Sequence, residues 1–322
     1  MKIAVLDDYQ NSVKDLACFD VLKGHDAHVF NETFLSVEDL VVNLKDFEAL
    51  VLIRERTVIS EDLLANLPNL KLISQTGKIS NHIDAKLCHK YGVAVAEGIG
   101  SPVAPSELCW GLIMSASRHI PEYVSQFSQG HWQQSGALGL GRVLSGSVLG
   151  IWGYGKIGQR IAQYAKAFGM KVQVWGSESS RALAQEHGFS AAESKEDFFQ
   201  TVDIITLHLR LNDATKAIVT QADLALMKAD SLLVNTSRAE LIESGALYAE
   251  MLANPSKRAA VDVFESEPAT VENEPLLSLP NVLCTPHIGY VEKASYEIYF
   301  KIAFENVVAF ADGKAENLVV IS

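Results

Sequence analysis

The chain has 322 residues, which is enough for about two domains. Its 27 lysine and arginine residues against 39 acidic residues give a formal net charge of −12, which disfavours non-specific binding to nucleic acid and to anionic membranes. No apolar run approaches the ~20 residues that span a bilayer, and the four cysteines lack the spacing of a metal site. We therefore expect a globular cytoplasmic protein that binds neither nucleic acid nor membranes and holds no metal.

The first hundred residues alternate between two hydrophobic periods. Short apolar runs typical of strands occupy residues 2–8, 26–32, 49–55, 70–77 and 92–98. Helical segments between them begin after Ser36 and Ser60, which are suitable N-cap residues followed by acidic residues. This alternation predicts a parallel sheet covered by helices on both faces.

The middle of the chain differs from this pattern. Residues 101–120 read as one long apolar helix, and residues 121–146 read as a loop rich in glycine, serine and glutamine. A connection of this length is usually functional or disordered.

The alternation then begins again. Strand-like runs occupy residues 148–153, 171–176, 203–209, 231–237, 258–264 and 281–287, and a helix is predicted from Glu292 to about Asp312. The chain therefore contains two successive doubly wound α/β units.

A glycine fingerprint lies at the start of the second unit. Gly153, Gly155 and Gly158 stand between a strand and a helix, in the order "GYGKIG". The first glycine suits a tight turn, the second a close approach of pyrophosphate, and the third close packing of helix on strand. The helix that follows presents free N–H groups to the phosphates. The context of strand, turn, helix and strand predicts a dinucleotide site.

The residue that selects between NAD and NADP is less clear. Gly176 stands at the end of the second strand, where an acidic residue that binds the ribose hydroxyls is usual. Glu178 favours NAD if it replaces that acid, whereas Ser177, Ser179 and Arg181 favour NADP if they bind a 2′-phosphate. Both cofactors therefore remain open.

Charged residues follow three of the later strands. Arg238, Asp262 and His287 each come at or just after a strand end, and Glu267 lies in the loop after Asp262. Ligands of open α/β sheets bind at the carboxyl ends of the strands. An arginine, a carboxylate and an imidazole at that edge suit proton transfer beside a hydride donor.

The motifs "GYGKIG", "LHL", "NTSRAELI", "DVFESEP" and "TPHIGY", in this order, resemble the D-isomer-specific 2-hydroxyacid dehydrogenase family over nearly the whole chain. The resemblance implies the catalytic residues Arg238, Glu267 and His287. It implies that the substrate carboxylate is bound by Arg238 and by the backbone N–H groups of Lys78 and Ile79. The expected cofactor contacts are Gly153, Tyr154, Gly155, Lys156, Ile157, Gly158, Ser177, Glu178, His208, Thr236, Asp262 and Gly289.

The resemblance also implies the domain organisation. The expected fold is α/β with two doubly wound parallel-sheet domains, a Rossmann cofactor domain inserted into a flavodoxin-like substrate domain. Residues 1–98 and 291–322 form the substrate domain, and residues 99–290 form the NAD(P)-binding domain. An arm at about residues 120–145 embraces a partner subunit, with Trp132 packed against it, so we expect a homodimer.

Three positions depart from the family pattern. Ile79 and Ala239 replace glycines that are usual there, and Gly176 replaces the usual aspartate. The expected activity is hydride transfer between NAD(P)H and a 2-keto acid, or a D-2-hydroxy acid in reverse, with glyoxylate, hydroxypyruvate and larger keto acids all open. The alternative is a dinucleotide-sensing binding protein, as in corepressors of the same architecture.

Overall fold

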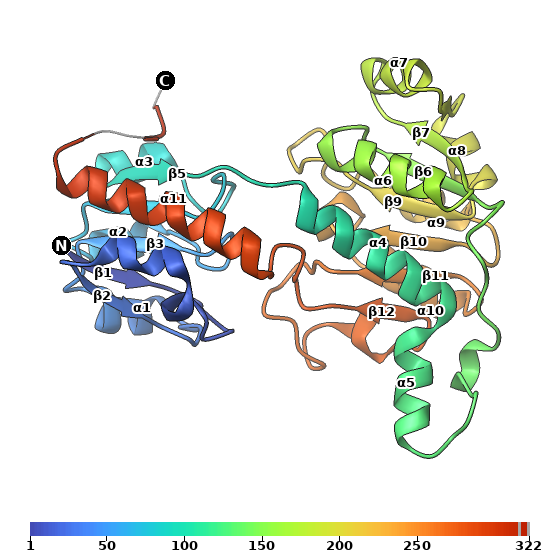
Figure 1. The fold of residues 1–322 in the computed structure, drawn as a ribbon, viewed down its shortest axis with the longest axis horizontal. Coiled ribbons are helices and arrows are strands. Elements are labelled where there is room, and N and C mark those ends of the chain that lie inside the picture. The colour runs from blue at the N-terminus through green and yellow to red at the C-terminus, as the bar shows by residue number, and fades with distance from the viewer. Residues whose placement is uncertain (315–316, 321–322) are drawn as a thin grey trace. The chain divides into compact units, whose positions relative to one another are not determined.

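The computed structural model describes residues 1–314 and 317–320 and divides into two compact units (Figure 1). Unit 1 comprises Met1–Ser101 and the described residues from Glu292 onward, and unit 2 comprises Pro102–Val291. These boundaries lie one to three residues from the crossings expected at 98–99 and 290–291. Residues 315, 316, 321 and 322 of the expected substrate domain lie outside the described residues.

Unit 1 is built on five parallel strands in the order β2-β1-β3-β4-β5, which is the flavodoxin-like order. Each lies within a predicted apolar run: β1 (Lys2–Val5), β2 (Asp26–Val29), β3 (Ala49–Leu52), β4 (Leu72–Gln75) and β5 (Ala94–Glu97). The side chains of Ser36 and Ser60 accept N–H groups at the start of α1 (Val37–Leu44) and α2 (Glu61–Ala65), so both predicted N-caps are confirmed.

The C-terminal helix returns to unit 1. Its remaining helices are α3 (Ala85–Lys90), the 3-10 helices Val13–Asp15 and Ala17–Leu22, and α11 (Lys293–Ala311). The Ser74 hydroxyl of β4 donates to the Ala303 carbonyl of α11 at 2.9 Å, and the rings of Phe19 and Phe304 meet edge to face. The chain thus leaves unit 1 once and comes back to it, which is the inserted arrangement that the resemblance implied.

Unit 2 is built on seven parallel strands in the order β12-β11-β10-β9-β6-β7-β8. They are β6 (Val148–Trp152), β7 (Lys171–Trp175), β8 (Ser190–Ala191), β9 (Ile204–Leu207), β10 (Leu232–Asn235), β11 (Arg258–Val261) and β12 (Val282–Cys284). Counted from β6, the order is the Rossmann order with β12 added at one edge. The sequence missed β8 because two residues are too few to show a period.

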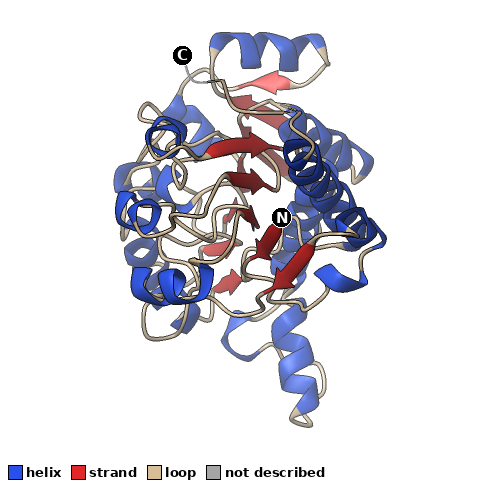
Figure 2. Ribbon diagram, turned by 90° about the vertical axis from the view of Figure 1, so that its left-hand side faces the viewer, coloured by secondary structure: helices blue, strands red, loops and turns tan. Residues whose placement is uncertain are grey.

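Two hydrophobic clusters, one on each face of this sheet, hold helices against it, and Figure 2 draws the helices on either side of the strands. Along β10, Leu232 and Val234 join the cluster with α4 and α6, while Leu233 joins the cluster on the opposite face, as alternation along a strand requires. The helices are α4 (Val103–Arg118), α5 (Ile120–Ser128), α6 (Lys156–Ala167), α7 (Glu178–Glu186), α8 (Lys195–Thr201), α9 (Gln221–Ala225) and α10 (Ala246–Ala253), with 3-10 turns at Gly136–Leu138, Ala239–Leu241 and Pro275–Ser278.

The segment after α4 differs from the prediction. The long helix is confirmed as α4, but residues 121–128, expected to be loop, belong to a separate helix, α5, that begins at Ile120. Ile120, Val124 and Phe127 recur at helical spacing, a signal that the surrounding serines and glutamines obscured. None of the α5 residues is buried, so α5 projects from the body of unit 2 (Figure 1).

Candidate active site and cofactor site

The glycine turn joins β6 to α6 and has the packing expected of a dinucleotide loop. A Cβ on Gly153, whose φ is 99°, would lie 2.6 Å from the carbonyl oxygen of His208, and a Cβ on Gly158 would lie 2.2 Å from the carbonyl oxygen of Gly153. A Cβ on Gly155 would meet nothing within 4 Å. Gly153 and Gly158 therefore allow close packing, whereas Gly155 faces open space at the N-terminus of α6, beside Lys156 and Ile157.

Tyr154 differs from the other residues of this turn, because its side chain points into the core. It is buried, and its hydroxyl lies 3.1 Å from Nδ1 of His187. Burial raises the pKa of the Tyr154 hydroxyl. Tyr154 can therefore reach a cofactor only through its backbone.

His208, which follows β9, is partly buried, and its two ring nitrogens have no hydrogen-bond partner. Neither ring nitrogen is exposed or hydrogen-bonded, and burial lowers the pKa of the imidazole to about 4. Buried polar atoms without partners are rare and call for a ligand or water. The His208 backbone carbonyl packs against Gly153, so this residue adjoins the glycine turn, and its unpartnered ring nitrogens fit the expected cofactor contact.

The start of α7 holds the residues expected to read the adenosine end of the cofactor. Gly176 has a φ of 148°, a backbone conformation that residues other than glycine rarely adopt. The usual aspartate would therefore be strained at this position. Ser177 caps α7 and its hydroxyl lies within 3.1 Å of those of Ser179 and Ser180. The Arg181 guanidinium stacks on the Trp175 ring at 4.8 Å, and its Nε is buried without a partner.

His287 and Glu267 are in direct contact. Nδ1 of His287 lies 2.7 Å from a carboxylate oxygen of Glu267, and the other oxygen accepts the Phe264 N–H at 3.0 Å. His287 has a φ of 50°, and its ring meets Tyr290 edge to face. With Nδ1 held by Glu267, Nε2 is the nitrogen available for proton exchange.

Asp262 holds the backbone around His287. Its oxygens accept the N–H groups of Ile288 and Gly289 at 2.8 and 2.9 Å and the Thr285 hydroxyl at 2.7 Å. The side chain is 1% exposed, and burial raises its pKa although these hydrogen bonds oppose the shift. Asp262 therefore positions the His287 loop, a role that the sequence did not reveal.

Arg238 follows β10, whose neighbour β11 pairs in turn with β12. Asn235 holds this turn, because its side chain donates to the Arg238 carbonyl at 2.8 Å and accepts the Ser237 N–H at 3.0 Å. Ala239 begins a 3-10 turn, so alanine is accommodated here without backbone strain. Thr236, the expected cofactor contact in this turn, interacts through its side chain with the Cys109 thiol of α4.

The expected substrate loop lies in unit 1, after β4. Its Ile79 N–H donates to a carboxylate oxygen of Glu97 at 3.2 Å, and the Lys78 ammonium pairs with the other oxygen. A Cβ on Gly77 would lie 2.3 Å from Nη1 of Arg54, so this guanidinium covers the loop. The sequence indicated the loop but missed Glu97, whose contact depends on β4 and β5 being neighbours.

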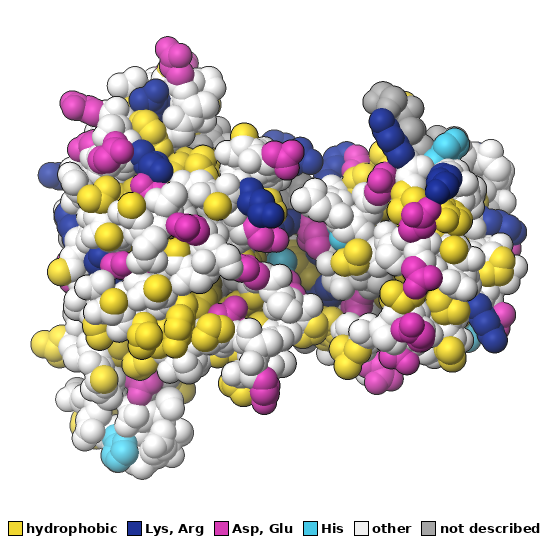
Figure 3. Space-filling model, turned by 180° about the vertical axis from the view of Figure 1, so that it is seen from behind, with side chains coloured by type: hydrophobic (Ala, Val, Ile, Leu, Met, Phe, Trp, Pro, Cys, Tyr) yellow, Lys and Arg dark blue, Asp and Glu magenta, His cyan; other side chains and the backbone are white. Residues whose placement is uncertain are grey.

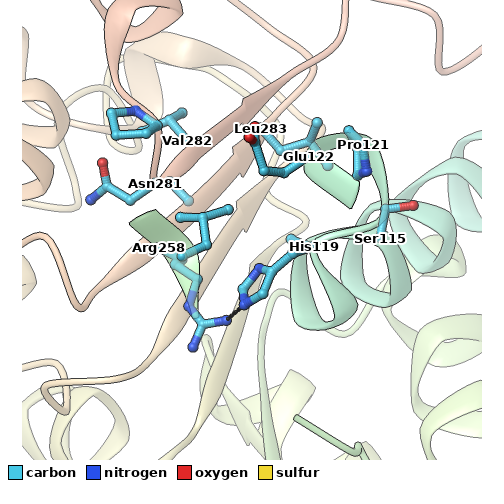
Figure 4. A pocket seen from close by; sticks show the side chains of 12 residues that line it. Ser115, His119, Pro121, Glu122, Arg258, Asn281, Val282 and Leu283 are labelled. Atoms are coloured by element: carbon cyan, nitrogen blue, oxygen red, sulfur yellow. Dashed lines mark hydrogen bonds between the residues drawn. The ribbon is translucent and has the colours of Figure 1, made fainter. Parts of the chain in front are cut away.

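A separate cavity of about 110 Å³ lies at the amino ends of β11 and β12 (Figure 4). His119 and Arg258 point toward each other there, with Nε2 and Nη1 3.1 Å apart. This contact holds the junction of α4 and α5, where His119 is left-handed. None of the expected site residues lines the cavity.

Within residues 1–314 and 317–320, no group of three or more histidine, cysteine, aspartate or glutamate residues is arranged to hold a metal ion. Across the same residues, no helix has the length and apolar character needed to cross a membrane.

Comparison with known proteins identifies the family. The model for "D-isomer specific 2-hydroxyacid dehydrogenase, NAD binding domain" matches residues 110–289. A glyoxylate reductase of Aeropyrum pernix is 34% identical over 290 residues, covering 88% of this chain and 85% of that protein. A D-3-phosphoglycerate dehydrogenase of Methanocaldococcus jannaschii is 32% identical over 289 residues, covering 89% of this chain but 54% of its own length, so this chain spans about half of that relative.

A solved structure agrees with both matches. The crystal structure of a phosphoglycerate oxidoreductase from Vibrio cholerae superposes with a TM-score of 0.96 at 67% identity, covering 97% of this chain and 99% of that one. The chain belongs to the D-isomer specific 2-hydroxyacid dehydrogenase family.

Proposed function

We propose that the protein is an NAD(P)-dependent oxidoreductase that reduces a 2-keto acid to a D-2-hydroxy acid, or catalyses the reverse reaction. The observation that carries the proposal is the contact of 2.7 Å between His287 and Glu267 in a loop held by Asp262. A dinucleotide sensor needs no such acid–base pair, so this contact favours an enzyme over the binding-protein alternative.

The proposed mechanism assigns one task to each residue. When bound, the nicotinamide supplies hydride to the carbonyl carbon of the keto acid. Arg238 binds the substrate carboxylate and polarises the carbonyl group. Nε2 of His287 gives a proton to the carbonyl oxygen and removes it in the oxidation direction, while Glu267 stabilises the charged imidazole.

The cofactor is proposed to occupy the open space at Gly155 and the N-terminus of α6, with the neutral His208 ring beside the turn. The family model supports NAD(H). We propose that NADP(H) also binds, because the start of α7 offers hydroxyl groups and Arg181 to a 2′-phosphate and Gly176 presents no carboxylate. We expect kcat/KM for NADH and NADPH to differ by less than ~100-fold.

Substitution of Glu178 tests the proposed use of both NADH and NADPH. If its carboxylate reads the ribose hydroxyls, Glu178→Ala shifts the ratio of the two kcat/KM values toward NADPH. A wild-type preference above ~1000-fold in either direction contradicts dual use.

The substrate is proposed to be a small 2-keto acid, since relatives of this chain are named for glyoxylate and phosphoglycerate. The test follows nicotinamide absorbance with a panel of glyoxylate, hydroxypyruvate, phosphohydroxypyruvate and longer keto acids. We expect oxidation of the reduced cofactor to depend on an added keto acid and to yield the D-hydroxy acid. A wild-type protein that binds NADH but reduces no member of the panel contradicts the proposal.

We also propose a homodimer formed through the arm, here defined as residues 120–145. Large hydrophobic side chains in this arm are exposed, with Trp132 at 71% and Leu140 at 90%. The others are Ile120, Val124, Phe127 and Val143. Figure 3 shows hydrophobic side chains gathered on the body of unit 2 next to the projecting arm. Such a surface is typical of a protein interface.

We retain the cytoplasmic location and the absence of nucleic-acid and membrane partners as proposals. The net charge of −12 supports the absence of such partners, and the four free cysteines, Cys18, Cys88, Cys109 and Cys284, support a reducing compartment.

A further inference from the structure

The expected substrate loop already binds a carboxylate, and that carboxylate belongs to the chain itself. Glu97 accepts the Ile79 N–H with one oxygen and the Lys78 ammonium with the other. The Glu97 side chain is 22% exposed, and that of Lys78 is 65% exposed. The chemical group that a 2-keto acid would present to this loop is therefore the group that Glu97 now presents.

The sheet places Glu97 within reach of the loop. β4 and β5 are neighbours with Gln75 opposite Glu97, so both strands end at the same level. The Gly98 N–H donates to the Gly77 carbonyl at 2.7 Å, which ties the loop to the end of β5. Because the backbones are fixed to each other, the Glu97 side chain is held near the Ile79 N–H.

We propose that Glu97 is an internal competitor of the substrate, a tethered carboxylate that occupies the loop and sets the apparent affinity for the keto acid. The proposal rests on the proposed function, in which this loop binds the substrate carboxylate. One N–H group cannot serve two carboxylates well, and two like charges in contact repel each other. Substrate binding then requires Glu97 to leave, and the apparent dissociation constant equals the intrinsic constant divided by the fraction of time that the loop is free.

Lys78 has a defined part in this exchange. Its ammonium group holds the second oxygen of Glu97 and keeps that carboxylate on the loop. When Glu97 leaves, the long and exposed Lys78 side chain can follow it or pair with the incoming acid. When Lys78 pairs with the incoming acid, the net charge of the loop is the same as with Glu97 bound.

Two substitutions separate competition from a simple effect of charge. Glu97→Asp keeps the negative charge but is one methylene too short to reach the Ile79 N–H. Glu97→Gln keeps the length but replaces a charge-assisted hydrogen bond by a weaker neutral one. We expect both to lower KM for the keto acid and the inhibition constant of oxamate, an unreactive keto-acid analogue, by roughly 3- to 30-fold. Glu61→Gln, which removes an exposed carboxylate paired with Lys90 in the same unit, is the control and should change neither constant.

Hydrogen exchange of the Ile79 amide gives a readout that does not depend on turnover. In the wild type without ligand, the Glu97 contact should slow exchange of this amide. In Glu97→Asp, exchange should be faster without ligand and slow again when oxamate and NADH are added. Unfolding midpoints near that of the wild type establish that both variants fold.

The possible outcomes are distinct. A lower KM for the keto acid and a lower inhibition constant of oxamate in both variants support the proposal that Glu97 competes with the substrate. A change in Glu97→Gln alone indicates long-range charge and overturns the proposal, as do constants equal to or above those of the wild type in both variants. If the wild type itself reduces no keto acid, the proposed function fails and the inference fails with it.

Discussion

At the scale of single residues, the site depends on carboxylates with different tasks. Glu267 contacts His287 directly, whereas Asp262 is buried beneath the same loop and binds its backbone N–H groups. A buried carboxylate that accepts several hydrogen bonds stabilises one loop conformation. The left-handed backbone at His287 is therefore held from both sides, by Glu267 at the ring and by Asp262 at the following amides.

His287→Gln should lower kcat by ~10²–10⁴-fold, because glutamine cannot transfer the proton. The dissociation constant for NADH should change little, since the ring is assigned to the substrate and not to the cofactor. Steady-state kinetics and NADH titration measure the two quantities. Normal turnover in this variant would remove His287 from the mechanism.

His208 should make the folded protein sensitive to acid. Burial holds its pKa at about 4 in the folded state, and the pKa of an exposed histidine is ~6.5. Between these values the unfolded chain binds a proton that the folded chain does not, so stability present above pH ~6.5 is lost as the pH falls toward ~4.

His208→Asn should reduce this loss. The free energy of unfolding of the wild type, relative to the variant, should fall by up to about 3 kcal/mol from pH ~7.5 to pH ~4. Urea unfolding of both proteins without cofactor measures the difference, with His89→Asn at an exposed position as the control. The same pH dependence in the wild type and in His208→Asn would contradict the burial argument.

At the scale of elements, the turn between β6 and α6 uses its glycines for two different purposes. Gly153 and Gly158 bring backbone segments closer than a Cβ permits, whereas Gly155 leaves open space at the start of α6. The first purpose concerns folding and the second concerns ligand binding. A matched pair of alanine variants can therefore separate them.

Gly158→Ala should destabilise the fold by about 1–3 kcal/mol, because its Cβ would lie 2.2 Å from the Gly153 carbonyl oxygen. Gly155→Ala should change stability by less than about 1 kcal/mol and weaken NADH binding about tenfold or more, because the new methyl group enters the expected pyrophosphate space. Thermal unfolding and NADH titration measure the two effects. Unaltered NADH binding in Gly155→Ala would place the pyrophosphate elsewhere.

At the scale of the whole molecule, the arm has few contacts with the core of unit 2 and exposes apolar side chains. The helix α5 buries none of its residues, yet its apolar positions recur at helical spacing. The rings of Phe127 and Trp132 stack edge to face at 5.7 Å and are both exposed. An isolated helix of this length is marginal in water, so the arm should gain stability from a partner.

Sedimentation at micromolar concentration should therefore give twice the chain mass of 35.1 kDa. Phe127→Ser combined with Trp132→Ser should shift the protein toward the monomer, because the substitutions remove the largest apolar groups of the proposed interface. Leu35→Ser, at an even more exposed apolar position in unit 1, should leave the mass unchanged. A monomeric wild type would contradict the proposed dimer.

Local patterns in the sequence were sufficient for much of this protein. The strands and the N-caps Ser36 and Ser60 follow from hydrophobic period and side-chain chemistry within a few residues, and the structure confirms them. The glycine fingerprint likewise reports a turn whose requirements are local. Helix α5 and the two-residue strand β8 were missed because their local signals were obscured or too short.

The tertiary structure decided the contacts between residues distant in the chain. Asp262 meets Gly289 and Glu97 meets Ile79 only because their strands are neighbours in a sheet, and no hydrophobic period encodes the order of strands. The unpartnered ring nitrogens of His208 and the positive φ of Gly176 have the same origin. Residue types and spacing along the chain determined which groups are available for chemistry, but strand order and burial determined which of them meet and in which protonation state.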